Sequence, residues 1–234
     1  MLLSNVKEIE IPEGKVKQIE KGSEILWKKS GFTFVNAIIG TGTQFIKLGK
    51  TIRQNYRIEM FIECTSLTNT ASNEIFGAQS ASANFPNGFS LLIYEGKDPY
   101  FYKNGYSGRI ASKRFWTSGH NFRIRNTTTS SDTLMLFERM QGDSIIEIVT
   151  VTAGNSASLS NETLEAYLMK FNTTEKFNYK AGMFKFKGLK VWDENDALVM
   201  NILPALDGSG VPCVVDLVDN RILYNAGTGV FGYE

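Results

Sequence analysis

The sequence predicts an all-β fold, an antiparallel two-sheet sandwich preceded by a small N-terminal β module. Three observations indicate this: many short apolar segments, a two-residue alternation inside several of them, and breaks rich in Gly, Asn, Ser and Thr between them. In residues 57–62, Ile58, Met60 and Ile62 fall on one face of a strand. In residues 184–187, two phenylalanines alternate with two lysines, which gives one apolar and one solvated face.

Composition supports one packed domain and excludes some partners. The 234 residues are 42% hydrophobic and include 16 Phe, 9 Tyr and 3 Trp, enough for a core without disulfide support. The formal net charge is +1, so there is no long-range attraction for phosphates, and nucleic acid is not expected as a partner. The first residues lack the apolar core of a secretory signal and no run has transmembrane length, so we expect a soluble protein made in the cytoplasm, without membrane insertion.

Residues 1–29 are predicted to form a separate β module. Strands are expected at residues 6–11, 16–19 and 24–27, with turns between them and a joint at residues 28–31. Three short strands bury too little apolar surface to be stable alone, so the module must dock on something. Two interpretations stay open: an attachment segment for another protein, or a plain extension of the main domain.

The second domain spans residues 32–234, and its strands follow one another in short steps. The segment at residues 162–171 also fits a helix, with Leu164, Leu168 and Phe171 on one side, but we expect a strand there. Polar runs at residues 65–73, 80–87, 127–132 and 154–161 are expected to be loops, where binding residues commonly lie. The predicted strands are residues 32–37, 44–48, 56–63, 74–78, 88–94, 100–103, 121–125, 133–137, 144–151, 165–171, 183–192, 198–203, 214–216 and 221–224.

Two sequence motifs lie at opposite ends of this domain. Near its end, Lys-Val-Trp-Asp at residues 190–193 precedes Leu-Pro-Ala-Leu-Asp at 203–207, and Tyr-Asn-Ala-Gly-Thr-Gly follows at 224–229. This order, with Cys213 between, resembles the end of LamG-like jelly-roll domains (concanavalin A-like lectin/glucanase) in tail and virion proteins of bacteriophages and prophages. The run Ile-Gly-Thr-Gly-Thr-Gln-Phe-Ile-Lys-Leu-Gly at residues 39–49 resembles the opening of the same domains.

The resemblance implies a jelly-roll sandwich over residues 32–234 and a role in a phage particle. The expected function is non-catalytic adhesion or receptor binding, directed at host cell-surface glycan; the alternative is a purely structural baseplate, tail or capsid decoration protein. Residues 1–29 are similar to phage tail segments that attach to other virion proteins. Homo-oligomers or many copies on the virion are therefore expected. The family's acidic and Ser positions are replaced here by Ile38, Ile39 and Gly40, so functions of those polar positions are not carried over.

The sequence contains no complete catalytic pattern. A retaining glycosidase needs two carboxyl groups about 5–5.5 Å apart, commonly from an E-x-D-x-x-E strand. Glu59 and Glu63 share a strand face without the central Asp, and Glu194 and Asp196 lie at a turn. The single histidine, His120, has no Gly-x-Ser-x-Gly nucleophile motif to serve. The sequence therefore predicts that the chain is not an enzyme.

The sequence also offers few residues for metal binding or for cysteine chemistry. Asp216 and Asp219 flank a turn, as do Asp193 and its neighbours, but turn chemistry explains both groups without calcium. No metal or other cofactor is predicted. Cys213 is expected to be a small buried hydrophobic residue, and a disulfide with Cys64 is the less favoured alternative.

Sugar binding requires aromatic rings on exposed turns. Tyr100, Tyr102 and Tyr106 lie in a segment rich in Asn, Asp and Lys, and Trp116 follows Phe115 in a second candidate segment. Rings of this kind stack on a sugar face while neighbouring polar groups bind its hydroxyls. The competing interpretation is that alternate tyrosines pack across a hairpin whose turn is Asn104-Gly105. The carbohydrate-binding candidates are Tyr100, Tyr102, Tyr106 and Trp116.

Overall fold

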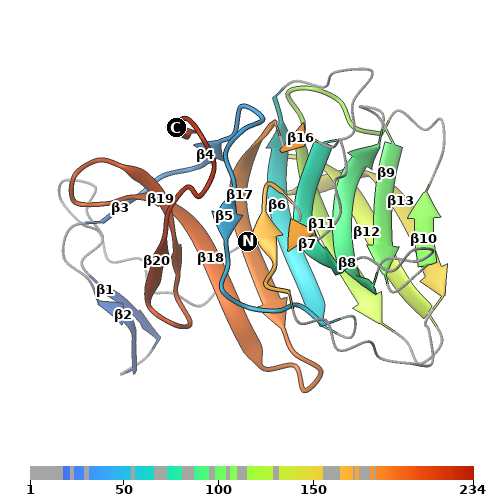
Figure 1. Ribbon diagram of the computed structural model, residues 1–234, viewed down its shortest axis with the longest axis horizontal. Coiled ribbons are helices and arrows are strands. Elements are labelled where there is room, and N and C mark those ends of the chain that lie inside the picture. The colour runs from blue at the N-terminus through green and yellow to red at the C-terminus, as the bar shows by residue number, and fades with distance from the viewer. Residues whose placement is uncertain are drawn as a thin grey trace.

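The computed structural model describes residues 18–21, 24–28, 32–53, 56–65, 73–80, 87–94, 98–103, 106–109, 115–128, 132–154, 164–170, 172–173, 180–181 and 183–234. Every regular element within these residues is a β-strand (Figure 1). The prediction of an all-β chain with antiparallel sheets is confirmed for this part of the chain. None of these residues belongs to a helix long and apolar enough to cross a membrane.

The larger sheet has the strand order β13-β12-β11-β6-β17-β18-β19-β20, and neighbouring strands along this path are antiparallel. Three short strands extend it, since β3 pairs with β18, β4 with β17, and β21 with β4. The strands are β3 (Thr33–Phe34), β4 (Ile38–Ile39), β6 (Arg57–Cys64), β11 (Asn121–Thr128), β12 (Asp132–Gln141), β13 (Ser144–Gly154), β17 (Phe184–Trp192), β18 (Leu198–Leu206), β19 (Pro212–Asp216), β20 (Arg221–Leu223) and β21 (Gly232–Tyr233).

The smaller sheet has the order β10-β9-β8-β7-β14-β5. Two further strands, β15 and β16, pair with β7 in parallel, which the sequence did not predict. The strands are β5 (Ile46–Lys47), β7 (Asn73–Ser80), β8 (Asn87–Tyr94), β9 (Asp98–Lys103), β10 (Tyr106–Arg109), β14 (Tyr167–Leu168), β15 (Asn172–Thr173) and β16 (Lys180–Ala181).

Strand alternation places one apolar core between the two sheets. In β6 the buried residues are Ile58, Met60, Ile62 and Cys64, and the residues between them are only half-buried. The same core cluster takes Phe76, Leu91 and Phe101 from the smaller sheet and Ile124, Phe137 and Phe186 from the larger one. Figure 1 shows the two layers overlapping, and β13 at one edge of the larger sheet contacts β9 and β10 of the smaller.

A second, smaller core covers the other face of β18 and β19. It is formed by Phe32, Ala205, Cys213 and Val215. Because β19 has a core on each side, all five of its residues are buried. Cys213 is a buried thiol outside any disulfide, as expected, and Cys64 is likewise reduced and buried in the main core.

Two successive hairpins of the larger sheet use the same capped loop. The carboxylate Oδ1 of Asp193 accepts hydrogen bonds from the main-chain N–H groups of residues 195 and 197, each at 2.9 Å. Asp207 caps residues 209 and 211 in the same way, at 2.8 and 2.9 Å. The fourth loop residue has positive φ in both, 61° at Asp196 and 78° at Gly210. These aspartates therefore serve as turn residues.

The two motif segments at opposite ends of the domain lie side by side. Ile46 and Asn225 form an antiparallel bridge, and the Ala226 N–H donates to the carbonyl oxygen of Phe45 at 2.8 Å. The Gln44 side chain, only 2% exposed, donates from Nε2 to the carbonyl oxygen of Val230 at 3.3 Å. The start and the end of the domain therefore close the same edge of the sandwich.

Two of the predicted strand regions are found only in part. The strand expected at residues 165–171 is reduced to β14, because Met169 adopts a left-handed φ of 65° that ends the extended conformation. The helical alternative does not occur in residues 164–170. At the N-terminus, β1 (Gln18–Lys21) and β2 (Glu24–Lys28) form a separate antiparallel hairpin, and the strand expected at residues 6–11 lies outside the described residues.

Candidate functional site on the outer face of the larger sheet

The outer face of the larger sheet carries charged side chains from several strands. Because Ile62 and Cys64 of β6 point into the core, Glu63 between them points outward. The strand register places Glu63 opposite Asn121 of β11 and opposite Lys185 of β17. A carboxylate, an amide and an ammonium group thus meet in one cross-strand row.

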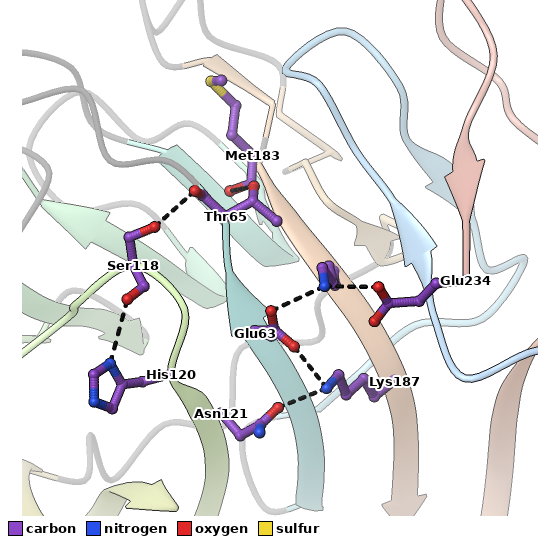
Figure 2. A network of polar contacts seen from close by, with 9 residues as sticks. Glu63, Thr65, Ser118, His120, Asn121, Met183, Lys187 and Glu234 are labelled. Atoms are coloured by element: carbon purple, nitrogen blue, oxygen red, sulfur yellow. Dashed lines mark hydrogen bonds and ion pairs between the residues drawn. The ribbon is translucent and has the colours of Figure 1, made fainter.

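Glu63 is the centre of the polar network drawn in Figure 2. Its Oε1 lies 3.0 Å from Lys185 Nζ, and its Oε2 lies 2.8 Å from Lys187 Nζ. Lys187 also donates to Asn121 Oδ1 at 2.6 Å, and Lys185 to Glu234 Oε2 at 2.7 Å. A bulge between Phe186 and Gly188 lets Lys185 and Lys187 reach the same carboxylate.

The network fixes the protonation state of its members. Burial is the largest single influence on Glu63 and raises its pKa, but the hydrogen bonds and charges of Lys187 and Lys185 together outweigh it, so the pKa is lowered. The hydrogen bonds from Lys185 to Glu234 and to Glu63 raise the pKa of Lys185. Glu63 is therefore an ionised acceptor at neutral pH, paired with two lysines and unsuited to donating a proton.

A serine and the only histidine lie beside this network without forming a catalytic pair. Ser118 Oγ donates to the carbonyl oxygen of Thr65 at 2.8 Å. His120 Nδ1 lies 3.3 Å from the main-chain oxygen of Ser118, and Figure 2 shows the ring directed there. Since the imidazole does not contact the Ser118 hydroxyl, this arrangement does not activate a serine nucleophile.

A second network lies further along the same face. The Glu138 side chain is fully buried. Its carboxylate accepts hydrogen bonds from Arg123 Nε and from Arg125 Nε and Nη2, the last at 2.8 Å. Burial raises the pKa of Glu138, but the two guanidinium groups more than offset this, and the pKa is lowered. The sequence signal for the site is an Arg-x-Arg pair, which places two guanidinium groups on one strand face; its partner, Glu138, was not predicted.

Glu59 and Glu63 share the outer face of β6, as the alternation predicted. Four residues along a strand separate their α-carbons by about 13 Å. Their register partners also differ, since Glu59 lies opposite Arg125 and Lys190. The two carboxylates therefore lie opposite different cationic residues along the strand.

The structure does not bring the predicted sugar-binding residues together. Trp116 is 2% exposed and packs edge-on against Phe122 and Phe137 in the core, so the prediction of an exposed ring is wrong for this residue. The Phe115-Trp116 pair lies on the core side of β11 and β12. Tyr100 is half-buried in β9, where it pairs with Leu92. The side chains of Tyr102 and Tyr106 lie outside the described part of the structure; their backbones belong to β9 and β10.

The acidic turns are occupied by protein groups. Asp216 Oδ1 accepts from the main-chain N–H groups of Asn201 and Val218, and Lys50 and Arg221 each lie 3.6 Å from Asp216 Oδ2. Asp219 Oδ2 lies 2.7 Å from Lys50 Nζ. Across the described residues, no three His, Cys, Asp or Glu side chains are grouped so as to hold a metal ion.

Comparison with known proteins does not assign the chain to a family. No protein-family model matches it, and no curated protein matches it. Among solved structures, it is similar to a crystal structure of Scytalido-glutamic peptidase with a peptide-based transition state analog. The match covers 88% of this chain and 99% of that one, at 13% sequence identity and a TM-score of 0.34.

This match bears on one prediction. The prediction that the chain is not an enzyme is contradicted by it, because the matched protein is a peptidase, and the prediction is withdrawn. At a TM-score of 0.34 the likeness carries no argument about the activity of this chain.

Proposed function

We propose that the chain is a virion- or tail-associated protein of a bacteriophage, and that it attaches the particle to host cells by binding cell-surface glycan. It would be made in the bacterial cytoplasm and act in the virion. The finer fold proposed with it is a LamG-like, concanavalin A-like jelly roll over residues 32–234.

One observation carries the proposal: the segments that resemble the two ends of LamG-like domains are in contact. Residues 39–49 and 224–231 are far apart in sequence, yet hydrogen bonds join them at Phe45 and Ala226 and at Thr43 and Thr228. Their contact supports reading them as parts of one domain of that family.

The proposed mode of action is multivalent. Single protein–sugar contacts are weak, and linking many copies raises the overall affinity by about 10²–10⁴ over one site. The hairpin of β1 and β2 pairs with no other described strand, which supports its proposed role in holding the domain to other virion proteins. A homo-oligomer or multicopy assembly is the form expected to bind cells.

The test is binding of the fluorescently labelled, purified chain to a panel of Gram-positive and gut bacteria, before and after periodate oxidation of their surface sugars. Binding that periodate abolishes supports the proposal. Binding that survives periodate but is lost after protease treatment of the cells contradicts the glycan receptor. Absence of binding to every strain, even with protein clustered on beads, contradicts cell attachment.

A second candidate function is purely structural, as a baseplate, tail or capsid decoration protein. The observation that favours it is an exposed apolar edge: Ile145, Ile146 and Ile148 of β13 are 39%, 48% and 52% exposed. Exposed apolar edge strands are typical of protein–protein contacts. A density map of the particle in which β13 is covered by another virion protein, together with no cell binding, would favour this candidate.

A further inference from the structure

An aromatic pair with two lysines lies on the outer side of the smaller sheet. Phe45 and Tyr167 stack with ring centroids 5.2 Å apart and an interplanar angle of 26°. Lys47 Nζ lies 5.7 Å from the centre of the Tyr167 ring, and Lys170 Nζ lies 4.9 Å from that of Phe45. These four residues, Phe45, Lys47, Tyr167 and Lys170, are called the Phe45–Tyr167 platform below.

Strand geometry explains why the platform faces outward. Ile46 and Leu168 are completely buried, so their neighbours Phe45, Lys47 and Tyr167 point away from the core. The register pairs Tyr167 directly with Lys47. Neither ring belongs to either core cluster, and both are half-buried, so each has surface in contact with solvent.

The platform lysines differ from the lysines of the ion-pair networks. Lys50, Lys185 and Lys187 each lie within 3.0 Å of a carboxylate oxygen. Lys47 and Lys170 have no carboxylate partner among the described residues, and the interaction found for each there is with one of the two rings. The Tyr167 hydroxyl likewise has no hydrogen-bond partner there. Two positive charges therefore lie at one spot without an ion-pair partner among the described residues.

Two backbone features hold the platform in place. Met169 is completely buried with a φ of 65°, a conformation that is unfavourable for a residue other than Gly, Asn or Asp, and it precedes Lys170. On the other side, a β-carbon at Gly227 would lie 2.9 Å from Cδ1 of Phe45. The Gly-rich motif at the end of the chain therefore leaves the space that the Phe45 ring occupies.

We propose that the Phe45–Tyr167 platform binds anionic sugar units of a surface polysaccharide. The rings would pack on the apolar C–H face of a sugar, the ammonium groups of Lys47 and Lys170 would bind its carboxylate or phosphate, and the Tyr167 hydroxyl would bind a sugar hydroxyl. The weak contacts between lysines and rings would be exchanged for stronger charge-assisted hydrogen bonds. The inference rests on the proposed glycan-binding function, from which it takes the class of ligand.

The experiment titrates the full chain by calorimetry with a hexagalacturonate, a phosphodiester-linked oligosaccharide, a neutral galactohexaose and a hexaglutamate peptide. The test variant is Lys47→Gln with Lys170→Gln, and Phe45→Leu removes one ring at similar volume. The matched control is Arg53→Gln with Lys190→Gln, which removes two positive charges elsewhere. Thermal unfolding of each variant shows whether it is folded.

The wild-type chain is expected to bind an anionic sugar and not galactohexaose. The double lysine variant and Phe45→Leu should each lower the affinity for that sugar about tenfold or more. The control variant should keep an affinity within twofold of wild type. Whichever anionic sugar binds identifies carboxylate or phosphate as the recognised group. Absence of binding by both anionic sugars, equal weakening in the control, or tighter binding of hexaglutamate would overturn the inference.

The same variants on bacterial cells separate this inference from the proposed function. If wild type and the double lysine variant bind cells equally, the platform is not the site, and attachment to cells stands. If wild type binds no cells but binds an anionic sugar through the platform, the platform stands, and attachment to host cells does not.

Discussion

Gly227 lies so close to Thr43 that a β-carbon on Gly227 would be 2.1 Å from the Thr43 carbonyl oxygen. No side chain fits between these two main chains, which come from opposite ends of the domain. The contact explains why the Asn-Ala-Gly sequence of the last motif needs glycine at this position. It also makes the closure of the sandwich sensitive to a single methyl group.

Gly227→Ala is therefore expected to lower the free energy of unfolding by about 3 kcal/mol, because the backbone at residue 43 or 227 must shift. The comparison is Gly142→Ala in the β12–β13 turn, where a β-carbon meets no atom within 4 Å and only the positive φ of 58° opposes it. Gly142→Ala should lower the free energy of unfolding by about 1 kcal/mol. Urea unfolding measures both, and equal losses would contradict the close contact.

Glu138→Gln is expected to destabilise the fold by about 2 kcal/mol at neutral pH. The substitution leaves Arg123 and Arg125 without their carboxylate, and the loss is moderated because both guanidinium groups reach solvent, with side chains 24% and 38% exposed. Glu194→Gln, in an exposed pair 3.9 Å from Arg53, is the control and should change stability by less than about 0.5 kcal/mol.

The stabilisation that Glu138 provides should decrease at acidic pH. Its pKa in the folded chain is lowered, so its stabilising contribution is complete above the ordinary glutamate pKa of about 4.3 and is lost as pH falls through the lowered value. The difference in unfolding free energy between wild type and Glu138→Gln should therefore shrink below about pH 4. A difference that grows on acidification would show that the guanidinium groups do not hold the ionised carboxylate.

Trp116→Ala is expected to cost about 3–5 kcal/mol of stability, as for other large core aromatics. Its ring packs 4.7 Å from Phe122, centroid to centroid, within the core. The measurement is urea unfolding beside Tyr233→Ala, whose ring is 53% exposed and whose loss should be small. A fully stable Trp116→Ala variant would place the ring on the surface after all.

Both thiols are expected to be unreactive in the folded chain. Cys64 and Cys213 are buried and form no disulfide, and burial, together with the charge of Glu63, raises the pKa of Cys64. Ellman's reagent should label neither thiol in buffer and two thiols per chain in denaturant. Labelling of one thiol in buffer would indicate that its core cluster is open, and fewer than two in denaturant would indicate a disulfide.

Strand prediction succeeded where one face of a segment meets the core and the other meets water. The strands expected at residues 56–63 and 183–192 are found as β6 and β17, within one residue at each end. It failed at β14, because the left-handed φ of Met169 depends on tertiary packing and leaves no trace in the alternation.

The sites were harder to predict than the strands. Trp116 stands in a segment without alternation, so its burial among three phenylalanines could not be inferred from sequence. Phe45 and Tyr167 are separated by most of the domain, and only the pairing of β5 with β14 brings them together. Glu138 looks like any strand glutamate until the register places Arg123 opposite it.

Amide hydrogen exchange at Ala226 tests the closure of the sandwich most directly. Its N–H donates to the Phe45 carbonyl oxygen at 2.8 Å, across the junction of the two motifs. Because this hydrogen bond protects the amide, its exchange should be slow, close to the rate set by global unfolding. In Gly227→Ala, exchange of the same amide should be much faster. Exchange of the Ala226 amide in the wild-type chain at the rate of an unstructured peptide would contradict it.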